Sequence, residues 1–163
     1  MNNSALFTHQ TITLISALTN THFSEITEFI IEKESQKYKA CSLKLKEKQI
    51  IYRHAHTTPK KVGQFVTFWK RDTNKQTAPL SESDTFDYFI IVTEKDTNIG
   101  YFKFPKLILI EKGIISSEHK EGKRGFRVYP PWDIASNKQA LNTQKWQLNY
   151  FVQSSKNQNY SND

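Results

Sequence analysis

The spacing of apolar residues changes along the chain, and each change predicts a helix or a strand. Apolar residues recur every three or four positions over 24–38, behind a possible capping residue, Ser24, so we predict a helix there. The run 4–18 is rich in threonine and fits a weaker helix. Over 42–52 apolar and polar residues alternate, which predicts one strand with an exposed basic face, or two strands joined by a turn.

Further apolar runs predict the strands of a sheet. Residues 64–71 and 86–93 are apolar on both faces, so we expect both strands to be central. The run 101–104 follows a polar loop and can form a hairpin with the strand before it. A short strand over 126–129 must end at the two prolines that follow, because proline cannot donate a hydrogen bond to a neighbouring strand.

Two more helices are expected in the second half of the chain. Pro105 suits the first turn of a helix that Gly113 would end, although a buried strand is an alternative for this run of leucine and isoleucine. Ser136 and Gln139 match a capping box, which predicts a final helix over 137–152.

The order of these elements predicts a single α/β or α+β domain, with a mixed β-sheet flanked by helices. A chain of 163 residues is long enough to bury one core without disulfides or metal. We assign residues 1–152 to this domain. Residues 153–163 are polar apart from one tyrosine, and we expect them to form a flexible tail.

Composition restricts the partner and the compartment. The 23 Lys and Arg residues outnumber the 16 Asp and Glu residues, giving a net charge of +7, which favours nucleic acid or another anionic surface. The lone Cys41 excludes an internal disulfide and suggests the reducing environment of the cytoplasm. The most apolar N-terminal run is short and interrupted, so we expect neither a signal peptide nor a membrane span.

One stretch, residues 53–71, contains no acid. It carries five fixed positive charges, two histidines and three aromatic residues, and ordinary surfaces rarely keep one sign over such a length. The expected loop 57–63 would present lysines beside backbone N–H groups, with the other cations at flanking strand ends. The alternative is a solvated lysine-rich turn above an aromatic core. The candidate contacts in this stretch are Arg53, Lys60, Lys61, Lys70 and Arg71.

A second acid-free block, residues 122–132, repeats the mixture of cations and rings. Arginine can grip a phosphate with two parallel hydrogen bonds, and an exposed Tyr or Trp can stack a base for about 1–3 kcal/mol. The alternative is that Tyr129 and Trp132 pack in the core beneath the prolines. The candidate contacts in this block are Lys123, Arg124, Arg127, Tyr129 and Trp132.

Metal and thiol chemistry receive less support. His54 and His56 would face the same way on a strand, as a pair of metal ligands must, but no further ligands follow at a recognisable spacing. We therefore expect no metal site and no cofactor. A Cys41 nucleophile has no identifiable His and Asn or Asp partner at a fitting spacing.

Four runs resemble the MepB family of small bacterial proteins: HTTPKKVGQFVTFWKR, FPKLILIEKGI, GKRGFRVYPPW and NKQALNTQKWQ, in this order. The likeness covers residues 29–152. The resemblance implies a fold similar to the PD-(D/E)xK restriction-endonuclease-like core, with a helix, a three-strand ribbon, a helix and another strand. The element order predicted above is compatible with that core.

The chemistry of such nucleases needs two carboxylates that hold a divalent cation and a lysine two residues after the second. By resemblance, Asp87 fits the first acid and Lys103 fits the lysine, but Tyr101 stands where the second acid belongs. A phenol is a poor magnesium ligand at neutral pH. A carboxylate from the N-terminal helix, Glu25 or Glu28, could replace it. The active site implied by the resemblance is therefore degenerate.

These observations together predict a cytoplasmic, catalytically inactive protein that binds nucleic acid through a basic and aromatic surface. Binding would be mainly electrostatic, with stacking that favours RNA or single-stranded DNA and with little sequence specificity. One alternative is a magnesium-dependent nuclease that uses Asp87, Lys103 and a helix glutamate. Another is a regulatory module that binds a protein or a small molecule.

Overall fold

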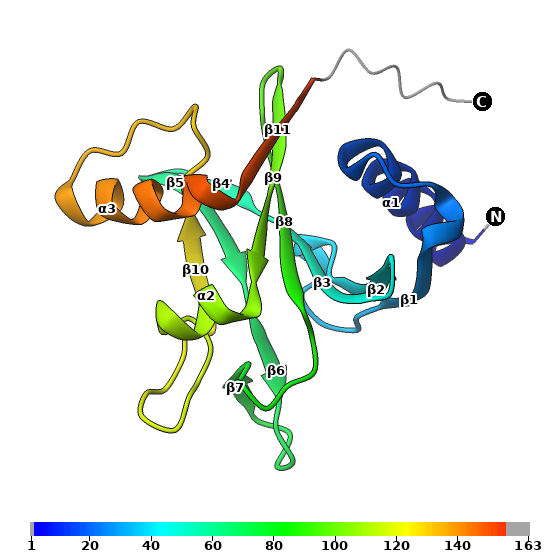
Figure 1. The fold of residues 1–163 in the computed structure, drawn as a ribbon, viewed down its shortest axis with the longest axis horizontal. Helices are drawn as coiled ribbons and strands as arrows, with labels where there is room; N and C mark the ends of the chain where they lie inside the picture. The colour runs from blue at the N-terminus through cyan, green and yellow to red at the C-terminus, as the bar shows by residue number, and fades with distance from the viewer. Residues whose placement is uncertain (1, 156–163) are drawn as a thin grey trace.

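The computed structural model describes residues 2–155, and these form a mixed α+β domain (Figure 1). Within these residues the chain forms eleven strands, three α-helices and short 3₁₀ turns. The elements are α1 (Asn3–Thr19), β1 (Ile26–Ile31), β2 (Cys41–Leu45), β3 (Lys48–His54), β4 (His56–Thr58), β5 (Lys61–Thr67), β6 (Trp69–Arg71), β7 (Thr77–Pro79), β8 (Tyr88–Lys95), β9 (Asn98–Pro105), α2 (Lys106–Glu111), β10 (Gly125–Val128), α3 (Lys138–Gln147) and β11 (Phe151–Ser155).

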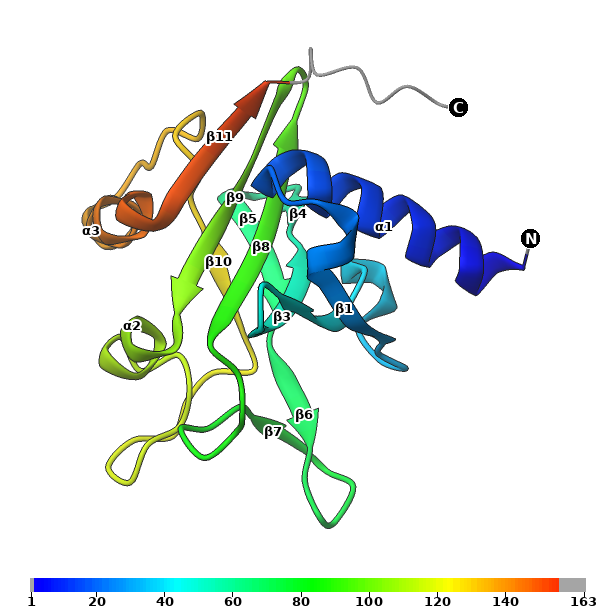
Figure 2. The ribbon, with the colours of Figure 1, turned by 45° about the vertical axis from the view of Figure 1, so that its right-hand side comes forward.

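A six-stranded sheet in the order β1-β2-β3-β8-β9-β11 forms the centre of the fold. All neighbouring strands in it are antiparallel except β3 and β8, which are parallel. The remaining strands form a three-stranded sheet, β10-β5-β4, and a short two-stranded ribbon, β6-β7. Helix α1 covers one face of the large sheet, whereas the small sheet and α2 lie on the other side (Figures 1 and 2).

Strand β8 separates two hydrophobic cores, as expected for a strand that is apolar on both faces. Phe89 and Ile91 point into the core shared with the small sheet and α2. Ile90 and Val92 point into the core beneath α1. Since successive side chains of a strand alternate between faces, the apolar run of β8 serves both cores at once. The prediction of a central strand here is confirmed.

The predicted helix over 24–38 is wrong, because its expected cap is used in a different turn. The His22 side chain accepts a hydrogen bond from the backbone N–H of Ser24, and the Glu25 carboxylate accepts one from His22 N–H, which closes a 3₁₀ turn. Strand β1 follows directly and pairs with β2. The real N-terminal helix is α1, the run predicted as the weaker one, and Asn2 caps it by accepting from Ala5 N.

The last predicted helix begins nearly as expected but ends earlier. Asn137, rather than Ser136, caps α3 by accepting a hydrogen bond from Ala140 N. After α3 the chain turns and enters β11, which pairs with β9. Residues 153–155 of the expected tail therefore belong to a strand, and the rest of that tail, 156–163, lies outside the described residues.

Most of the other predicted elements agree with the structure, but the single strand predicted over 64–71 is divided between two sheets. The β8–β9 hairpin, α2 after Pro105 and β10 before the two prolines are all present. The run 64–71 divides into β5, central in the small sheet, and β6, which pairs with β7. Residues 42–52 form two strands, β2 and β3, joined by a turn. No helix in residues 2–155 combines the length and apolar character that crossing a bilayer requires.

The element order implied by the endonuclease-like core is matched at its start. Helix α1 precedes three antiparallel strands, β1 to β3. The next strand of the large sheet is β8, which lies parallel to β3. In the described chain the segment between β3 and β8 contains strands β4 to β7 and no helix, so the connection differs from the implied one.

Candidate nucleic-acid interface

A pocket of about 600 Å³ lies between the β4–β5 hairpin, β10, the end of α2 and α3. Among the described residues, its lining holds five cations and no carboxylate. We call it the basic pocket, and its cations are Lys60, Lys61, Lys112, Lys123 and Arg127. Because the lining contains no acid, the electrostatic fields of the five cations add, which favours an anion over a cation in the pocket.

The tip of the β4–β5 hairpin supplies two of these lysines. The loop expected over 57–63 is a tight turn in which Thr58 pairs with Lys61. Lys60 and Lys61 are exposed, and neither side chain makes a hydrogen bond or ion pair within residues 2–155. Lys123 is also exposed and unpaired in the same part of the chain. These three ammonium groups are therefore available to a ligand.

Arg127 is fixed from β10 by neutral acceptors on the same hairpin. Its Nη2 donates to Thr58 Oγ1 at 2.6 Å, and its Nη1 lies 3.3 Å from the carbonyl oxygen of Val62. None of its hydrogen-bond partners in the described chain is a carboxylate. The guanidinium is thus oriented without being neutralised, and positioned arginines of this kind suit phosphate binding.

Gly63 lets the pocket's tyrosine approach the hairpin backbone. Its φ is +84°, a left-handed conformation, and a Cβ at this position would lie 2.7 Å from Cε1 of Tyr129. Glycine alone meets both conditions without strain. Tyr129 therefore packs against the hairpin and is half-buried, with part of its ring on the pocket lining.

Gln147 attaches α3 to the outer edge of β10. It is fully buried, its Nε2 donates to the carbonyl of Arg127 at 2.9 Å, and its Oε1 accepts from Tyr129 N at 2.8 Å. Gln144 donates to the carbonyls of Tyr129, Pro130 and Asp133. One helix face thereby replaces a neighbouring strand and forms one wall of the pocket.

Lys112 and Gln147 line the basic pocket, although the sequence pattern did not predict them there. The Nζ of Lys112 lies 5.5 Å from the ring centroid of Trp146 on α3, so a cation–π contact holds it at the pocket. It lies outside both acid-free blocks. The only sequence signal was its place at the end of a helix that a glycine stops, which marks an exposed turn but no binding role.

The other cations predicted from residues 53–71 are each paired with a carboxylate. Arg53 Nη2 lies 2.8 Å from Glu32 Oε2, and Arg71 binds Glu34 with an Nη2–Oε1 distance of 2.6 Å. The hydrogen bond from Arg71 lowers the pKa of Glu34. The third pair joins Lys70 to Asp84. We call this set the paired cations: Arg53, Lys70 and Arg71.

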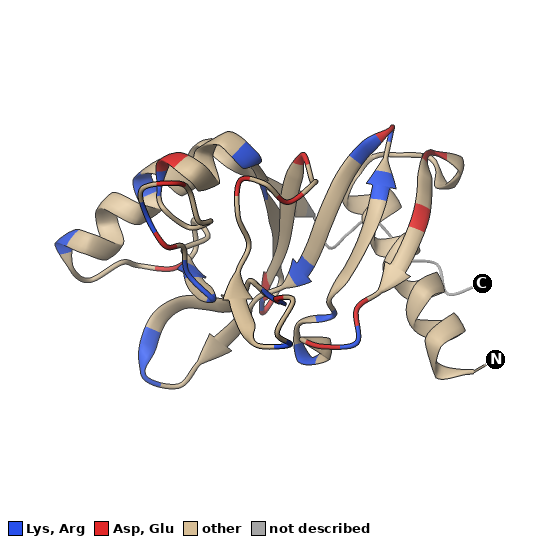
Figure 3. Cartoon of the chain, turned by 90° about the horizontal axis from the view of Figure 1, so that it is seen from below, with Lys and Arg blue, Asp and Glu red and all other residues tan. Residues whose placement is uncertain are grey.

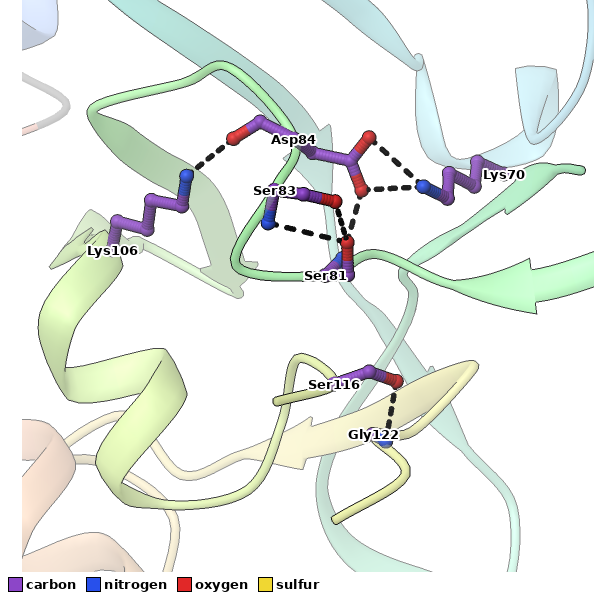
Figure 4. Close-up of polar contacts among 7 residues, drawn as sticks. All are labelled: Lys70, Ser81, Ser83, Asp84, Lys106, Ser116 and Gly122. Carbon is purple, nitrogen blue, oxygen red and sulfur yellow. Dashed lines mark hydrogen bonds and ion pairs between the residues drawn. The ribbon is translucent and has the colours of Figure 1, made fainter. Parts of the chain in front are cut away.

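Figure 4 shows how completely Lys70 is engaged. Its Nζ lies 2.9 and 2.7 Å from the two carboxylate oxygens of Asp84, and the same carboxylate accepts from Ser81 N. Lys106 donates to the Asp84 carbonyl from the other side. Lys70 therefore anchors the 81–84 loop to β6. This structural role leaves little of its charge for a ligand.

The second predicted block is divided in the same way. Lys123, Arg127 and Tyr129 line the basic pocket. Arg124 is exposed, but it contacts Glu121 at 3.4 Å and donates to the carbonyl of Thr77. The Trp132 ring packs edge-on against Phe151 at a centroid distance of 5.6 Å and is half-buried, which favours the interpretation as a packing residue.

The degenerate nuclease residues do not come together. Asp87 accepts from Gln49 N at 2.8 Å, and Tyr101 is buried beneath α1, where burial raises its pKa. Burial also lowers the pKa of Lys103, whose Nζ lies 4.4 Å from the Tyr88 ring. Glu28 on β1 is three strands away from β8 and pairs with a lysine of β2. The Asp87 carboxylate thus links the start of β8 to β3, and within residues 2–155 it belongs to no cluster of three potential metal ligands.

Metal and thiol candidates have structural partners of their own. His54 Nε2 lies 2.7 Å from the Tyr52 hydroxyl, whereas His56 Nε2 lies 2.6 Å from the carbonyl of Lys37. Desolvation lowers the pKa of His54 to about 3. Cys41 is buried, and burial raises the pKa of its thiol. Within residues 2–155, no three His, Cys, Asp or Glu side chains are grouped so that they could hold a metal ion.

Comparisons with known proteins agree on one family. Residues 32–153 match the family model described as MepB-like. The fold is similar to a crystal structure of MepB, with a TM-score of 0.79 and 37% sequence identity. That alignment covers 94% of this chain and 98% of the other. No curated protein matches the chain.

Proposed function

The chain belongs to the MepB-like family, and we propose that it binds nucleic acid, RNA or single-stranded DNA, without cleaving it. The observation that carries this proposal is the basic pocket, which gathers five cations and no carboxylate from the described residues. Charge assembled from distant segments into one hollow is expected where a polyanion is bound. The proposal includes the cytoplasmic location that a lone, buried Cys41 suggests.

Each part of the pocket has its own role in this proposal. Lys60, Lys61 and Lys123 contact successive phosphates as mobile point charges, and Arg127 fixes one phosphate with the guanidinium N–H groups that its hairpin partners leave free. In this proposal the pocket receives the sugar–phosphate chain, and Tyr129 and Trp146, which line it, contact an unstacked base. A duplex would reach only the rim, so single strands are favoured.

The absence of cleavage in this proposal is supported by the positions of the candidate acids. The carboxylate of Asp87 accepts from the backbone of β3, and Tyr101 stands opposite Val92 under α1 where a second metal ligand would be needed. The relation to the restriction-endonuclease-like core is part of the proposal. The order α1, β1, β2, β3 supports it, and the all-strand connection from β3 to β8 weighs against it.

A salt series with labelled oligonucleotides tests the binding. We expect single-stranded RNA or DNA to bind at low salt, with the logarithm of the affinity falling by about 0.7 for each phosphate contact per tenfold rise in salt. Replacing Lys60, Lys61 and Lys123 with glutamate should weaken binding by about 100-fold or more at low salt.

The matched control reverses the same number of charges elsewhere. Lys37, Lys48 and Lys75 are exposed and lie outside the pocket lining, so glutamate at all three changes the net charge equally. This control should weaken binding by less than about tenfold. Equal losses in the two variants would show that net charge alone attracts nucleic acid. No binding at low salt, or binding indifferent to salt, would refute the proposal.

Incubation of the parent and Asp87→Ala with RNA and DNA in Mg²⁺ or Mn²⁺ tests the absence of cleavage. We expect neither protein to cut, because the carboxylate accepts a hydrogen bond from β3 and is part of no cluster of three potential metal ligands in residues 2–155. Cleavage by the parent that disappears in Asp87→Ala would instead establish the nuclease alternative.

A further inference from the structure

A second pocket, of about 290 Å³, lies between the end of β1, β3 and β6, and it shares no lining residue with the basic pocket. Arg53 contributes to its wall and is only 1% exposed. Ile51, Trp69 and Leu80 supply apolar surface. We call it the arginine pocket. The rest of the lining is polar or charged and includes Lys33, Glu34, Lys70 and Arg71. A concave site that combines apolar surface with fixed polar groups can hold a small molecule.

The hydrogen bonds of Arg53 are incomplete. Nη2 donates to Glu32 Oε2 at 2.8 Å and Nη1 lies 3.3 Å from the carbonyl oxygen of Tyr52. The Nε is buried and meets no acceptor among the described residues. A guanidinium has five N–H donors, and an unmade bond on a buried charged group is costly. Nη1 and Nη2 each keep one N–H that these two bonds do not use, and an acceptor atom on a ligand at the pocket wall would bond there.

Glu32 places an acceptor beside these donors. One of its oxygens is bound by Arg53, and its side chain is 32% exposed on the pocket lining. The other oxygen, Oε1, has no hydrogen-bond partner within residues 2–155. The pair therefore presents N–H donors from Arg53 next to a carboxylate oxygen of Glu32.

We propose that the arginine pocket binds a planar lactam ring, the cyclic amide edge of hypoxanthine, guanine or uracil. The ring carbonyl accepts from Arg53, and the adjacent ring N–H donates to Glu32. Adenine and cytosine reverse this edge, since an amino group replaces the carbonyl and a lone pair replaces the N–H. They would set donors against Arg53 and a lone pair against the carboxylate, so the pocket should reject them.

The apolar wall fits the faces of such a ring. Arg71 lies over the Trp69 ring at 5.1 Å, and Glu34 fixes Arg71 with three hydrogen bonds, so the indole is held in place. Ile51 and Leu80 complete the apolar part of the lining. The pocket is less than half the volume of the basic pocket, which suits one base with its sugar.

Isothermal titration calorimetry with two matched pairs of uncharged nucleosides tests the proposal. Inosine differs from adenosine, and uridine from cytidine, at the lactam edge. We expect inosine to bind at least about tenfold more tightly than adenosine, and uridine to exceed cytidine in the same direction. Equal affinity within a pair, or no binding by any nucleoside, would overturn the proposal.

Two variants separate recognition from folding. Glu32→Gln should lower the affinity for inosine about tenfold or more, towards that for adenosine, because the charged acceptor is lost. Since Glu32 partners a buried arginine, thermal unfolding must confirm that this variant folds. Trp69→Ala leaves the Arg53–Glu32 pair intact and should weaken both purine nucleosides while inosine keeps its advantage. Unchanged inosine binding in both variants would place the nucleoside elsewhere and overturn the assignment.

Further arms identify the source of the ring and keep this proposal distinct from nucleic-acid binding at the basic pocket. Lys60→Glu with Lys61→Glu should leave nucleoside binding unchanged; a parallel loss would put the ligand in the basic pocket and overturn the proposal. An oligocytidine carrying one uridine tests a base within a strand. If the uridine raises affinity and Glu32→Gln removes the gain, the ring comes from a strand. If only free uridine binds, it comes from a nucleoside.

Discussion

The two groups of cations that residues 53–71 supply behave oppositely. At the hairpin tip, Lys60 and Lys61 join a pocket whose described lining holds no acid. At the strand ends, Arg53, Lys70 and Arg71 each meet a carboxylate. Figure 3 shows acidic and basic segments in many parts of the fold. A segment that contains no acid in the sequence can therefore still lie beside acids from other segments of the fold.

The neighbours of β5 and β6 explain the contrast. At the end of β5, Thr67 donates to Ser35, which places the acidic 32–34 segment beside the chain that continues into β6. At the start of β5, the neighbour is β10, whose Arg127 reaches the hairpin turn. One end thus receives acids from a distant loop, while the other receives a further cation. Pairing with a carboxylate, rather than charge alone, thus decides which of these cations stay free to attract an anion.

Breaking the ion pair between the buried Arg53 and the partly exposed Glu32 should have the largest effect. We expect Arg53→Met to lower the free energy of unfolding by about 3–5 kcal/mol, because Glu32 loses its partner and the interior loses its guanidinium packing. Urea denaturation followed by circular dichroism measures this. The exposed pair provides the control, since Arg71→Met should cost no more than about 1 kcal/mol. Similar losses in the two variants would contradict the distinction between buried and exposed pairs.

Neutralising two cations in each group tests the comparison directly. Lys60→Gln with Lys61→Gln should weaken single-strand binding by about 10- to 30-fold and reduce the salt slope by about 1.4. Lys70→Gln with Arg71→Gln removes the same formal charge but should change affinity by less than about threefold, because Asp84 and Glu34 already balance those cations. Fluorescence anisotropy across a salt series gives both quantities. Equal losses of affinity in the two double variants would contradict the distinction between free and paired cations.

Shape can be separated from charge at Gly63. Gly63→Ala should lower stability by about 1–2 kcal/mol, because alanine is strained at φ +84° and its methyl group would displace the Tyr129 ring. All five pocket cations are kept, so any loss of single-strand binding in the folded variant measures the contribution of the pocket's shape. Thermal unfolding and anisotropy give the two numbers. Unchanged stability would show that the ring moves away freely.

A smaller effect is the pH dependence of stability that His54 causes on β3, the strand that also carries Arg53. Desolvation holds the pKa of His54 at about 3, well below its usual value near 6.5. Between these values the unfolded chain binds a proton that the folded chain excludes, so stability falls as pH falls. We expect a loss of about 1 kcal/mol between pH 6.5 and 5.5 from this group. Urea midpoints should show it in the parent and lack it in His54→Gln.

Sequence patterns correctly predicted the elements whose ends are set by nearby residues, such as prolines and turns. Pro105 starts α2, the two prolines end β10, and the polar turn makes the β8–β9 hairpin. The helix over 24–38 failed because Ser24 and Glu25 close a 3₁₀ turn and the apolar residues that follow pair with β2. That pairing depends on a partner strand beyond the local window, so tertiary contact overrode the helical spacing.

Only part of the candidate site was predicted, because sequence patterns report local composition and not contacts between distant segments. Lys60, Lys61, Lys123 and Arg127 stand in acid-free runs, and these runs mark the segments that line the pocket. The paired cations were also predicted as ligand contacts, but carboxylates from distant segments bind them instead. Lys112 joins the site only because α2 ends near α3. Spacing along the chain contains no information on either encounter.

The attachment of Gln147 to β10 has a consequence for self-association. The small sheet ends at β10, and a free strand edge offers its backbone groups to another chain. Here the side-chain amide of Gln147 occupies the carbonyl of Arg127 and the N–H of Tyr129, the groups that an added strand would use first. One glutamine thus closes this edge of the sheet to edge-to-edge pairing. The same side chain therefore occupies this strand edge and holds the wall of the basic pocket.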